Sequence, residues 1–381
     1  KKNIAKDKTK LLKDILAKNI IFLDGAMGTM IQSQSFSEQF FRGKLFKNCK
    51  EDLQGNNDIL SLTQPDSIKK IHMSFLQSGA DIIETNTFNA NSISQSDYGL
   101  AHKSFDLNLA SARLARESVN NFKIKSDKPK FVAGVLGPTN KTLSISPDIN
   151  RPAFRSLKFD TLVTVYEEAL SGLIYGGIDL VLVETIFDTL NCKAAIKAIQ
   201  KVFNGLGIRL PIMLSGTITD SSGRLLSGQT VSAFWNSVKH INPLSIGFNC
   251  ALGASSLRQY IAELSSIANV YTSLHPNAGL PNELGNYDES PEYMEGHLLE
   301  LAKEKYVNIV GGCCGTTPKH IERITSSLKN VQDVRIPPKD SKICVLSGLE
   351  SLVLNDTTGF VNIGERTNIS GSKTFEKLIK N

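Results

Sequence analysis

The sequence predicts an α/β protein built as a closed (β/α)8 TIM barrel. Short apolar runs rich in β-branched residues alternate with longer stretches of helical hydrophobic period, and this alternation occurs eight times. Each apolar run ends at Gly, Asn, Thr or Pro, as expected for buried parallel strands. Eight consecutive units of strand then helix favour a barrel over an open sheet.

The eight expected strands are spread along most of the chain. They are expected at residues 19–25, 80–88, 130–138, 178–185, 210–217, 244–250, 268–279 and 307–315. Between the first strands, Asp66 is expected to cap a helix that ends at Gly79. Thr317 followed by Pro318 is expected to open the last helix. The loop at residues 27–65 is unusually long, and loops of that kind commonly cover an active site or are partly disordered.

The pattern changes near residue 331. We divide the chain into a barrel at residues 1–330, a linker at residues 331–357 and a third segment at residues 358–381. The third segment has the pattern of a strand, a turn and the start of a helix, which we interpret as the truncated start of a second barrel. A lone strand cannot fold by itself, so we expect the chain to be a fragment of a longer protein.

Composition indicates a globular protein in the cytoplasm. Of 381 residues, 41% are hydrophobic and 21% are charged, which is typical of a soluble domain with a substantial core. No run approaches the roughly 20 apolar residues of a membrane helix, and no signal core follows the Lys-rich start. The net charge of +6 is spread along the chain without basic runs interleaved with aromatics. We therefore expect neither a membrane nor a nucleic acid as partner.

Three of the six cysteines lie where strands end. Cys250 ends the sixth strand, and Cys313 and Cys314 end the eighth. Carboxyl ends of barrel strands meet at one mouth, so these thiols are expected to converge there. A buried core cysteine would explain Cys250 alone, and a vicinal redox pair would explain the other two, but neither explains all three. Three thiolates favour Zn²⁺ with an open fourth position.

The ligand type indicates the chemistry. Hydrolytic zinc usually has His or carboxylate ligands, whereas three thiolates give the site a net charge near −1 and a weaker Lewis acid. A substrate thiol bound as fourth ligand would stay deprotonated near neutral pH and remain nucleophilic. The residues therefore predict activation of a thiol for alkylation, without identifying the thiol.

Three motifs resemble those of the homocysteine S-methyltransferase family. They are GFNC (247–250), GGCCGTTP (311–318) and DGAMGTM (24–30), and the resemblance spans roughly residues 8–330. FVNIGERTNISGSKTF (360–375) is similar to the start of the pterin-binding barrel in the family's cobalamin-dependent methionine synthases, and GNNDILSLTQPD (55–66) to their first loop. The resemblance implies a zinc-dependent methyltransferase that activates homocysteine as a thiolate for methylation by methylcobalamin. The product would be methionine, and the cobalamin and folate domains of the full-length protein would be partners.

The resemblance also implies roles for individual residues. The expected zinc ligands are Cys250, Cys313 and Cys314. Asn277 matches the position that can fill the fourth site while substrate is absent. Asp24 and Glu184 match acidic groups that face the homocysteine amino group, although Asp24 before a glycine could also simply shape a turn. Thr85 and Ser215, with nearby backbone amides, are expected to hold the substrate carboxylate.

Other residues are expected to be structural or inert. Strand alternation would point Glu84 away from the lumen, and His72 and His275 are expected to be structural. The cysteines outside the strand ends are expected to be inert: Cys49, Cys192 and Cys344. Four tail residues resemble folate-domain residues but would have no role in this chain: Asn362, Glu365, Arg366 and Asn368.

Two other functions remain open. The chain could be a stand-alone homocysteine methyltransferase that uses betaine or S-methylmethionine and carries an unrelated tail. It could also be a ligand-binding barrel with a structural zinc and no chemistry. Appreciable turnover of homocysteine with betaine or S-methylmethionine would favour the stand-alone enzyme. A zinc site that does not change when homocysteine is added would favour the structural zinc.

Overall fold

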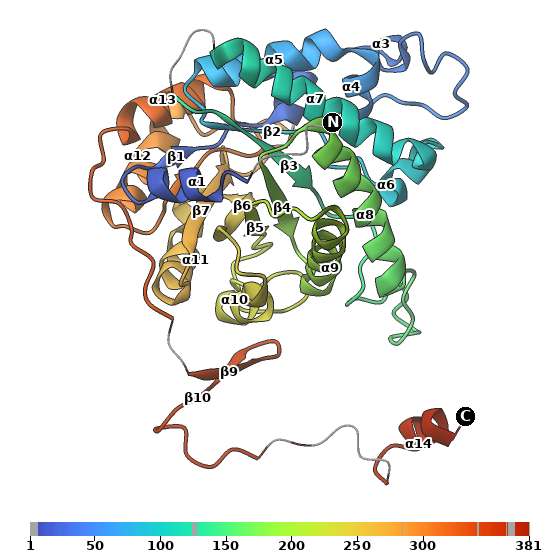
Figure 1. The fold of residues 1–381 in the computed structure, drawn as a ribbon, viewed down its shortest axis with the longest axis vertical. Coiled ribbons are helices and arrows are strands. Elements are labelled where there is room, and N and C mark those ends of the chain that lie inside the picture. The colour runs from blue at the N-terminus through green and yellow to red at the C-terminus, as the bar shows by residue number, and fades with distance from the viewer. Residues whose placement is uncertain are drawn as a thin grey trace.

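Eight parallel strands close into a barrel in the computed structural model, which describes residues 7–123, 128–283, 285–340, 343–362, 364 and 370–380. The strands pair in the order β1-β8-β7-β6-β5-β4-β3-β2. A parallel bridge between Leu23 and Ile82 joins the two ends of this order. Helices surround the strands (Figure 1). The predicted (β/α)8 barrel is confirmed.

Every strand overlaps a segment in which the sequence predicts one. The strands are β1 (Ile21–Phe22), β2 (Ile82–Glu84), β3 (Phe131–Leu136), β4 (Leu180–Ile186), β5 (Ile212–Gly216), β6 (Ser245–Gly253), β7 (Tyr271–Asn277) and β8 (Ile309–Val310). Inward side chains such as Ile82 and Met213 form a core inside the barrel. Their neighbours Ile83 and Leu214 belong to the larger core between strands and helices. This alternation is that of a filled barrel.

One long helix follows each strand. These helices are α5 (Pro65–Gln77), α7 (Ser104–Lys123), α8 (Phe159–Gly176), α9 (Thr189–Leu206), α10 (Val231–Val238), α11 (Ala254–Ile267), α12 (Pro291–Lys303) and α13 (Pro318–Leu328). The predicted start of α13 is confirmed, since Thr317 forms a capping box with His320. The predicted cap of α5 is wrong: Asp66 lies in the first turn, because Pro65 takes the first helical position.

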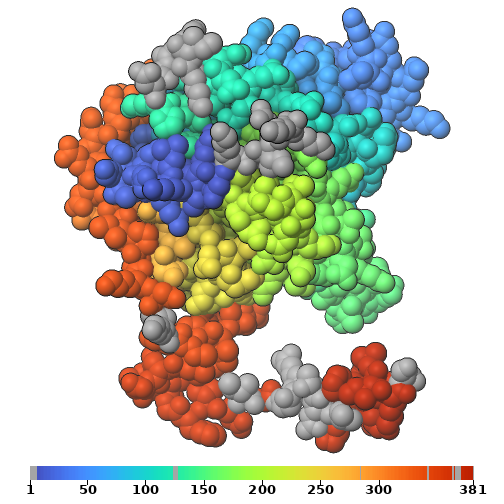
Figure 2. Space-filling view, in the orientation of Figure 1, coloured from blue at the N-terminus to red at the C-terminus, as the bar shows by residue number. Residues whose placement is uncertain are grey.

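The amino-terminal helix α1 (Thr9–Leu16) closes one end of the barrel. Leu12 and Leu16 are fully buried and belong to the core inside the barrel. In Figure 1 this helix lies in front of the strands, and in Figure 2 it forms the blue surface on the same face. The carboxyl ends of the strands lie at the opposite end, where barrels of this type carry their chemistry.

The long first loop is folded. Short helices occupy it and the connection after β2: α2 (Met27–Gln32), α3 (Glu38–Arg42), η1 (Asn57–Ile59), α4 (Leu60–Thr63), α6 (Ser92–Gln95), η2 (Ser96–Tyr98) and η3 (Ala101–Lys103). A further turn, η4 (Lys239–Ile241), follows α10. Arg42 pairs with Glu38 at 2.5 Å and donates to the carbonyl of Glu51 at 2.8 Å, which ties the loop to itself. Two side chains of the loop itself, Leu53 and Leu60, are fully buried.

The chain stays attached to the barrel beyond residue 330. Arg335 is buried and donates hydrogen bonds of 2.6–2.8 Å to the carbonyls of Ser265, Ala268 and Val270. A hairpin of β9 (Cys344–Ser347) and β10 (Ser351–Leu354) then packs on α10, where Ser347 Oγ donates to the carbonyl of Ala233 at 2.7 Å.

The last described element is α14 (Lys373–Lys380), so part of the expected final segment is helical. The described residues between β10 and α14, including Asn362, form no strand. Glu365, Arg366 and Asn368 lie outside the described residues. The division into barrel, linker and second barrel stays a prediction. Across the described part of the chain, every helix is too short or too polar to span a lipid bilayer.

Candidate metal and substrate site

The structure brings together the three cysteines that the sequence singles out. The Sγ atoms of Cys250 and Cys314 lie 3.8 Å apart, and all three sulfurs, including that of Cys313, lie within 4.8 Å of one another. None is in a disulfide. Sulfurs bound about 2.3 Å from a tetrahedral zinc would lie about 3.8 Å apart. The cluster therefore fits a soft tetrahedral dication that keeps one position for another ligand.

An irregular end of β6 places Cys250 in this cluster. The pairing of β6 with β7 is interrupted between Asn249 and Gly253, and Cys250 and Ala251 have φ of 60° and 57°. Left-handed backbone is unfavourable for residues other than glycine, so the surroundings must impose it. Gly247 allows the two strands to approach, because a Cβ there would lie 1.8 Å from the carbonyl oxygen of the β7 strand.

Asn277 lies beside the cysteine loop that follows β8. The Cys313 amide donates to the carbonyl of Pro276 at 2.8 Å, and the Ala278 amide donates to the carbonyl of Cys314 at 2.9 Å. Asn277 stands between these two hydrogen bonds. Its Oδ1 is buried and has no hydrogen-bond partner in the described part of the chain. An orphaned carboxamide oxygen at this position fits a neutral fourth ligand.

The three thiols differ in how readily they ionise. Hydrogen bonds from Cys250 and Cys313 lower the pKa of Cys314 to about 3. The pKa of Cys313 is raised, first by its hydrogen bond to Cys250 and further by Cys314 and burial. One thiolate and two thiols are the arrangement that like-charge repulsion allows without a cation. Ionisation of all three would require a positive charge among them.

Tyr287 also contacts the cluster, and no sequence motif marks it. Burial and the nearby charge of Cys314 raise the pKa of Tyr287. A Cβ on Gly315 would lie 2.3 Å from the Cβ of Tyr287, and Gly315 has a φ of 80°. Glycine at position 315 therefore lets the tyrosine lie across the cysteine loop.

A second group of polar side chains lines the barrel interior. Carboxylate oxygens of Glu84 and Glu184 and a ring nitrogen of His275 lie within 4.8 Å of one another, and His275 Nε2 is 3.3 Å from Glu184 Oε2. Asp24 joins them, since its Oδ2 accepts a hydrogen bond from the Glu84 amide at 3.1 Å. The expectation that Glu84 points away from the lumen is wrong, because Glu84 has the same inward phase as Ile82. His275, expected to be structural, faces the same carboxylates.

No Lys or Arg of the described residues forms an ion pair with these carboxylates, and among basic side chains only His275 lies beside Glu184. Burial raises the pKa of Asp24 and of Glu84, and repulsion by Glu184 raises both further. Asp24 Oδ1 and Glu84 Oε1 are buried without hydrogen-bond partners in the described residues. Two carboxylates and an imidazole are also ligand types for divalent metals. An ammonium group would supply both the missing charge and the missing donors.

Thr85 and Ser215 are engaged in the barrel wall. Thr85 Oγ1 accepts from the Val135 amide at 2.9 Å and contacts Thr87 Oγ1 at 2.7 Å. Ser215 Oγ donates to Asn249 Oδ1 at 2.7 Å. Both residues are buried, so their hydroxyls would have to exchange these partners to reach a substrate carboxylate.

Among the cysteines expected to be inert, Cys49 and Cys344 lie outside the cluster, and burial raises the pKa of Cys192 to about 12. His72 is also buried, which lowers its pKa to about 4. These properties agree with structural roles.

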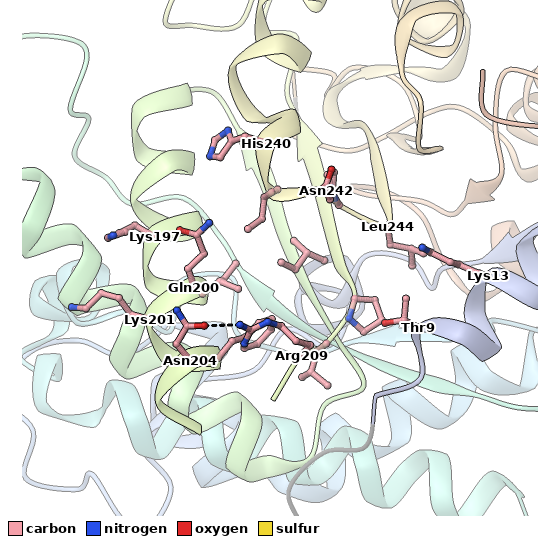
Figure 3. A pocket seen from close by; sticks show the side chains of 17 residues that line it. Thr9, Lys13, Lys197, Gln200, Lys201, Asn204, Arg209, His240, Asn242 and Leu244 are labelled. Carbon is pink, nitrogen blue, oxygen red and sulfur yellow. Dashed lines mark hydrogen bonds between the residues drawn. The ribbon is translucent and has the colours of Figure 1, made fainter. Parts of the chain in front are cut away.

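Another hollow lies near the amino ends of β5 and β6, away from the cysteines. It has a volume of about 460 Å³, and its basic lining residues are Lys13, Lys197, Lys201, Arg209 and His240. Figure 3 shows that their charged ends diverge, and that the guanidinium of Arg209 is already bonded to Asn204. The hollow does not gather these charges around one point.

A family model described as homocysteine S-methyltransferase matches residues 21–328. The chain belongs to the homocysteine S-methyltransferase family. The predicted family is thereby confirmed, and the matched range includes both the cysteine cluster and the acidic group of this methyltransferase-family barrel.

Solved structures of the homocysteine methyltransferase MmuM from Escherichia coli have the same fold. The oxidized form matches with a TM-score of 0.64 and 18% identity, covering 84% of this chain and 99% of that chain. The metallated form matches with a TM-score of 0.62 and 19% identity over the same shares. At these identities the likeness shows the fold. The narrower assignment to cobalamin-dependent methionine synthases stays a prediction.

Proposed function

We propose that this barrel activates homocysteine as a thiolate for methyl transfer, on a Zn²⁺ ion held by Cys250, Cys313 and Cys314. The observation that carries the proposal is the meeting of three free thiols at the mouth of a homocysteine S-methyltransferase barrel. Zinc, when bound, supplies the charge that keeps all three ligands and an added substrate thiol deprotonated near neutral pH.

The acidic group positions the other end of the substrate. Asp24 and Glu84 accept hydrogen bonds from the substrate ammonium through oxygens that have no partner in the described residues, and Glu184 beside them adds a further negative charge. Charge-assisted hydrogen bonds of this kind are about twice as strong as neutral ones. Asn277 would offer its buried, unpartnered carboxamide oxygen to the metal while substrate is absent. A substrate thiol that binds there in its place would release its proton to solvent.

The methyl donor in this proposal is methylcobalamin, as in the cobalamin-dependent methionine synthases. The tail motif at residues 360–375 supports this assignment. Methylcobalamin and the folate substrate would be bound by other domains of the full-length protein. The isolated chain should therefore bind zinc and homocysteine, yet produce little or no methionine.

A stand-alone methyltransferase is the second candidate. The match covers 99% of the solved MmuM chain, so this chain contains the whole fold of that homocysteine methyltransferase structure. Such an enzyme would methylate homocysteine with betaine or S-methylmethionine. Supplying the isolated chain with each donor separates the candidates, because appreciable turnover with either one contradicts the cobalamin assignment.

The zinc proposal is tested by X-ray absorption at the zinc edge. Protein purified under reducing conditions should hold one zinc with three sulfur ligands, and homocysteine should add a fourth sulfur. Cys314→Ser should lose the metal, whereas Cys344→Ser, on the exposed hairpin, should keep it. A chain that holds no zinc would contradict the proposal. A four-ligand site that ignores homocysteine would instead support a structural zinc.

A further inference from the structure

The carboxamide of Asn249 links parts of the site that are far apart in the sequence. The side chain is fully buried, and its Oδ1 accepts hydrogen bonds from the Thr185 amide at 3.0 Å and Ser215 Oγ at 2.7 Å. Its Nδ2 donates to Thr185 Oγ1 at 2.8 Å and to Cys313 Sγ at 3.9 Å. One planar group therefore contacts β4, β5 and the cysteine loop after β8.

The β4 end of this link is strained. Thr185 has a φ of 54°, which is rare for a β-branched residue. The pairing of β4 with β5 shifts register between Val183 and Ile186, so Glu184 and Thr185 form a bulge. Bulges beside active sites re-aim side chains, and the residue aimed here is Glu184. Asn249 holds Thr185 in this conformation by accepting a hydrogen bond from its amide and donating one to its hydroxyl.

The sulfur end of the link acts on a proposed zinc ligand. An amide that donates to a thiolate fixes the direction of the sulfur and withdraws part of its charge. The Asn249 amide does not titrate, so this donor is present at every pH. A carboxylate at the same position would offer Cys313 a negative charge in place of a proton.

We propose that Asn249 is a positioning residue that ties Cys313 to the bulge that aims Glu184. The metal end and the ammonium end of the substrate site are thereby held at one separation, which sets the length of the amino thiol that fits. This inference rests on the proposed function, because it assigns Cys313 to zinc and Glu184 to the substrate ammonium.

The test compares Asn249→Asp with Ser215→Ala in the full chain. Asn249→Asp keeps the shape of the side chain but loses the donor to sulfur. Ser215→Ala removes another hydrogen bond to the same carboxamide and leaves that donor in place. Zinc affinity is measured by competition with a chromophoric chelator, and homocysteine affinity by calorimetry at saturating zinc.

We expect Asn249→Asp to lower zinc affinity by roughly 10–100-fold, as changes to groups that orient metal ligands do. It should also weaken homocysteine binding and shift the thiolate-to-metal charge-transfer band of the Co²⁺-substituted protein. Ser215→Ala should leave the zinc affinity and the band close to those of the parent. Equal zinc affinity and equal Co²⁺ spectra in both variants would overturn the inference and leave Asn249 a structural role only.

A measurement on the unaltered protein covers the case in which Asn249→Asp does not fold. In the ¹¹³Cd-substituted chain, a side-chain amide proton of Asn249 should show scalar coupling to the metal through the Cys313 sulfur. A coupling absent from an otherwise assigned spectrum would overturn the inference. Failure of the parent chain to take up any metal would contradict the proposed function itself. That outcome is distinct from failure of the inference on Asn249, which is judged only by comparing metal-loaded proteins.

Discussion

Glu84→Gln should stabilise the substrate-free barrel near neutral pH and at the same time weaken homocysteine binding. The substitution preserves shape and removes one of the buried carboxyl groups. Burial raises the pKa of Glu84 above its ordinary value of 4.5, and the charges of Glu184 and Asp24 raise it further. A carboxyl group in this environment lowers the free energy of unfolding, because its ionised form is buried beside other negative charges.

The sign and size of the effect follow from proton linkage. Because the pKa of Glu84 is raised on folding, the folded chain binds more protons than the unfolded chain at pH values between 4.5 and the folded pKa. The free energy of unfolding therefore falls as pH rises through that window, by up to about 1.4 kcal/mol per pH unit for one proton. Glutamine has no such loss. The stability gained by the variant should be small near pH 4 and grow with pH.

Urea unfolding of the zinc-free, reduced chain at several pH values measures this difference, provided that the slope with urea is the same in both proteins. Glu263→Gln, on the exposed face of α11, is the matched control. Calorimetry on the zinc-loaded proteins measures homocysteine binding, which Glu84→Gln should weaken roughly tenfold or more, as expected for a lost hydrogen bond to a charged group. A stability difference that does not change with pH, or a variant less stable than the parent at pH 7, would refute the reasoning.

Three further substitutions test other parts of the structure. Gly247→Ala would place a Cβ 1.8 Å from the Ser273 carbonyl oxygen and should cost about 3 kcal/mol or more, measured by thermal unfolding. Gly315→Ala should displace Tyr287 and strain a residue with φ of 80°, so the chain should bind zinc more weakly in chelator competition. Arg335→Met removes a charged donor from three barrel carbonyls and should cost about 2–4 kcal/mol in urea unfolding. Parent-like values would contradict each expectation.

The barrel and the meeting of the cysteines could be predicted because both depend on chain order. Each strand is a short buried run with clear ends, and eight such runs leave few alternatives to a closed barrel. Once the barrel is accepted, the carboxyl ends of β6 and β8 must lie at the same mouth. Topology therefore brings the chain segments of Cys250, Cys313 and Cys314 together, whereas the inward direction of the Cys250 side chain depends on the irregular end of β6.

The orientation of Glu84 could not be predicted in the same way. Strand β2 is three residues long, and polar residues continue without interruption from its last residue, Glu84, to Thr87. Alternation within so short a strand leaves two registers, and a shift of one residue exchanges the inward and outward faces. The structure resolves the choice through pairing, because Ile82 and Glu84 are paired with Phe131 and Ala133 of the inward-facing set of β3.

Asn249 and Tyr287 were missed for other reasons. The role of Asn249 depends on left-handed backbone at Thr185 and Cys250. Neither residue is a glycine, so the sequence gives no sign of this conformation. Tyr287 reaches the cysteines from the loop after β7, and the conformation of a loop is not fixed by periodicity. The contacts of both residues depend on backbone conformations that the local sequence pattern does not predict.

The two ends of the barrel differ in how completely their groups are satisfied, and this difference bears on the substrate. At the amino end, α1 seals the interior with Leu12 and Leu16. At the mouth, the buried oxygens of Asp24 and Glu84 have no donor among the described residues, and the sulfurs of three thiols lie within 4.8 Å of one another. In the proposed function, a substrate ammonium donates hydrogen bonds to these oxygens. A metal held by the three sulfurs binds one more thiolate. A molecule with an ammonium at one end and a thiol at the other is the smallest ligand that would engage both, which supports the proposal that the substrate is an amino thiol such as homocysteine.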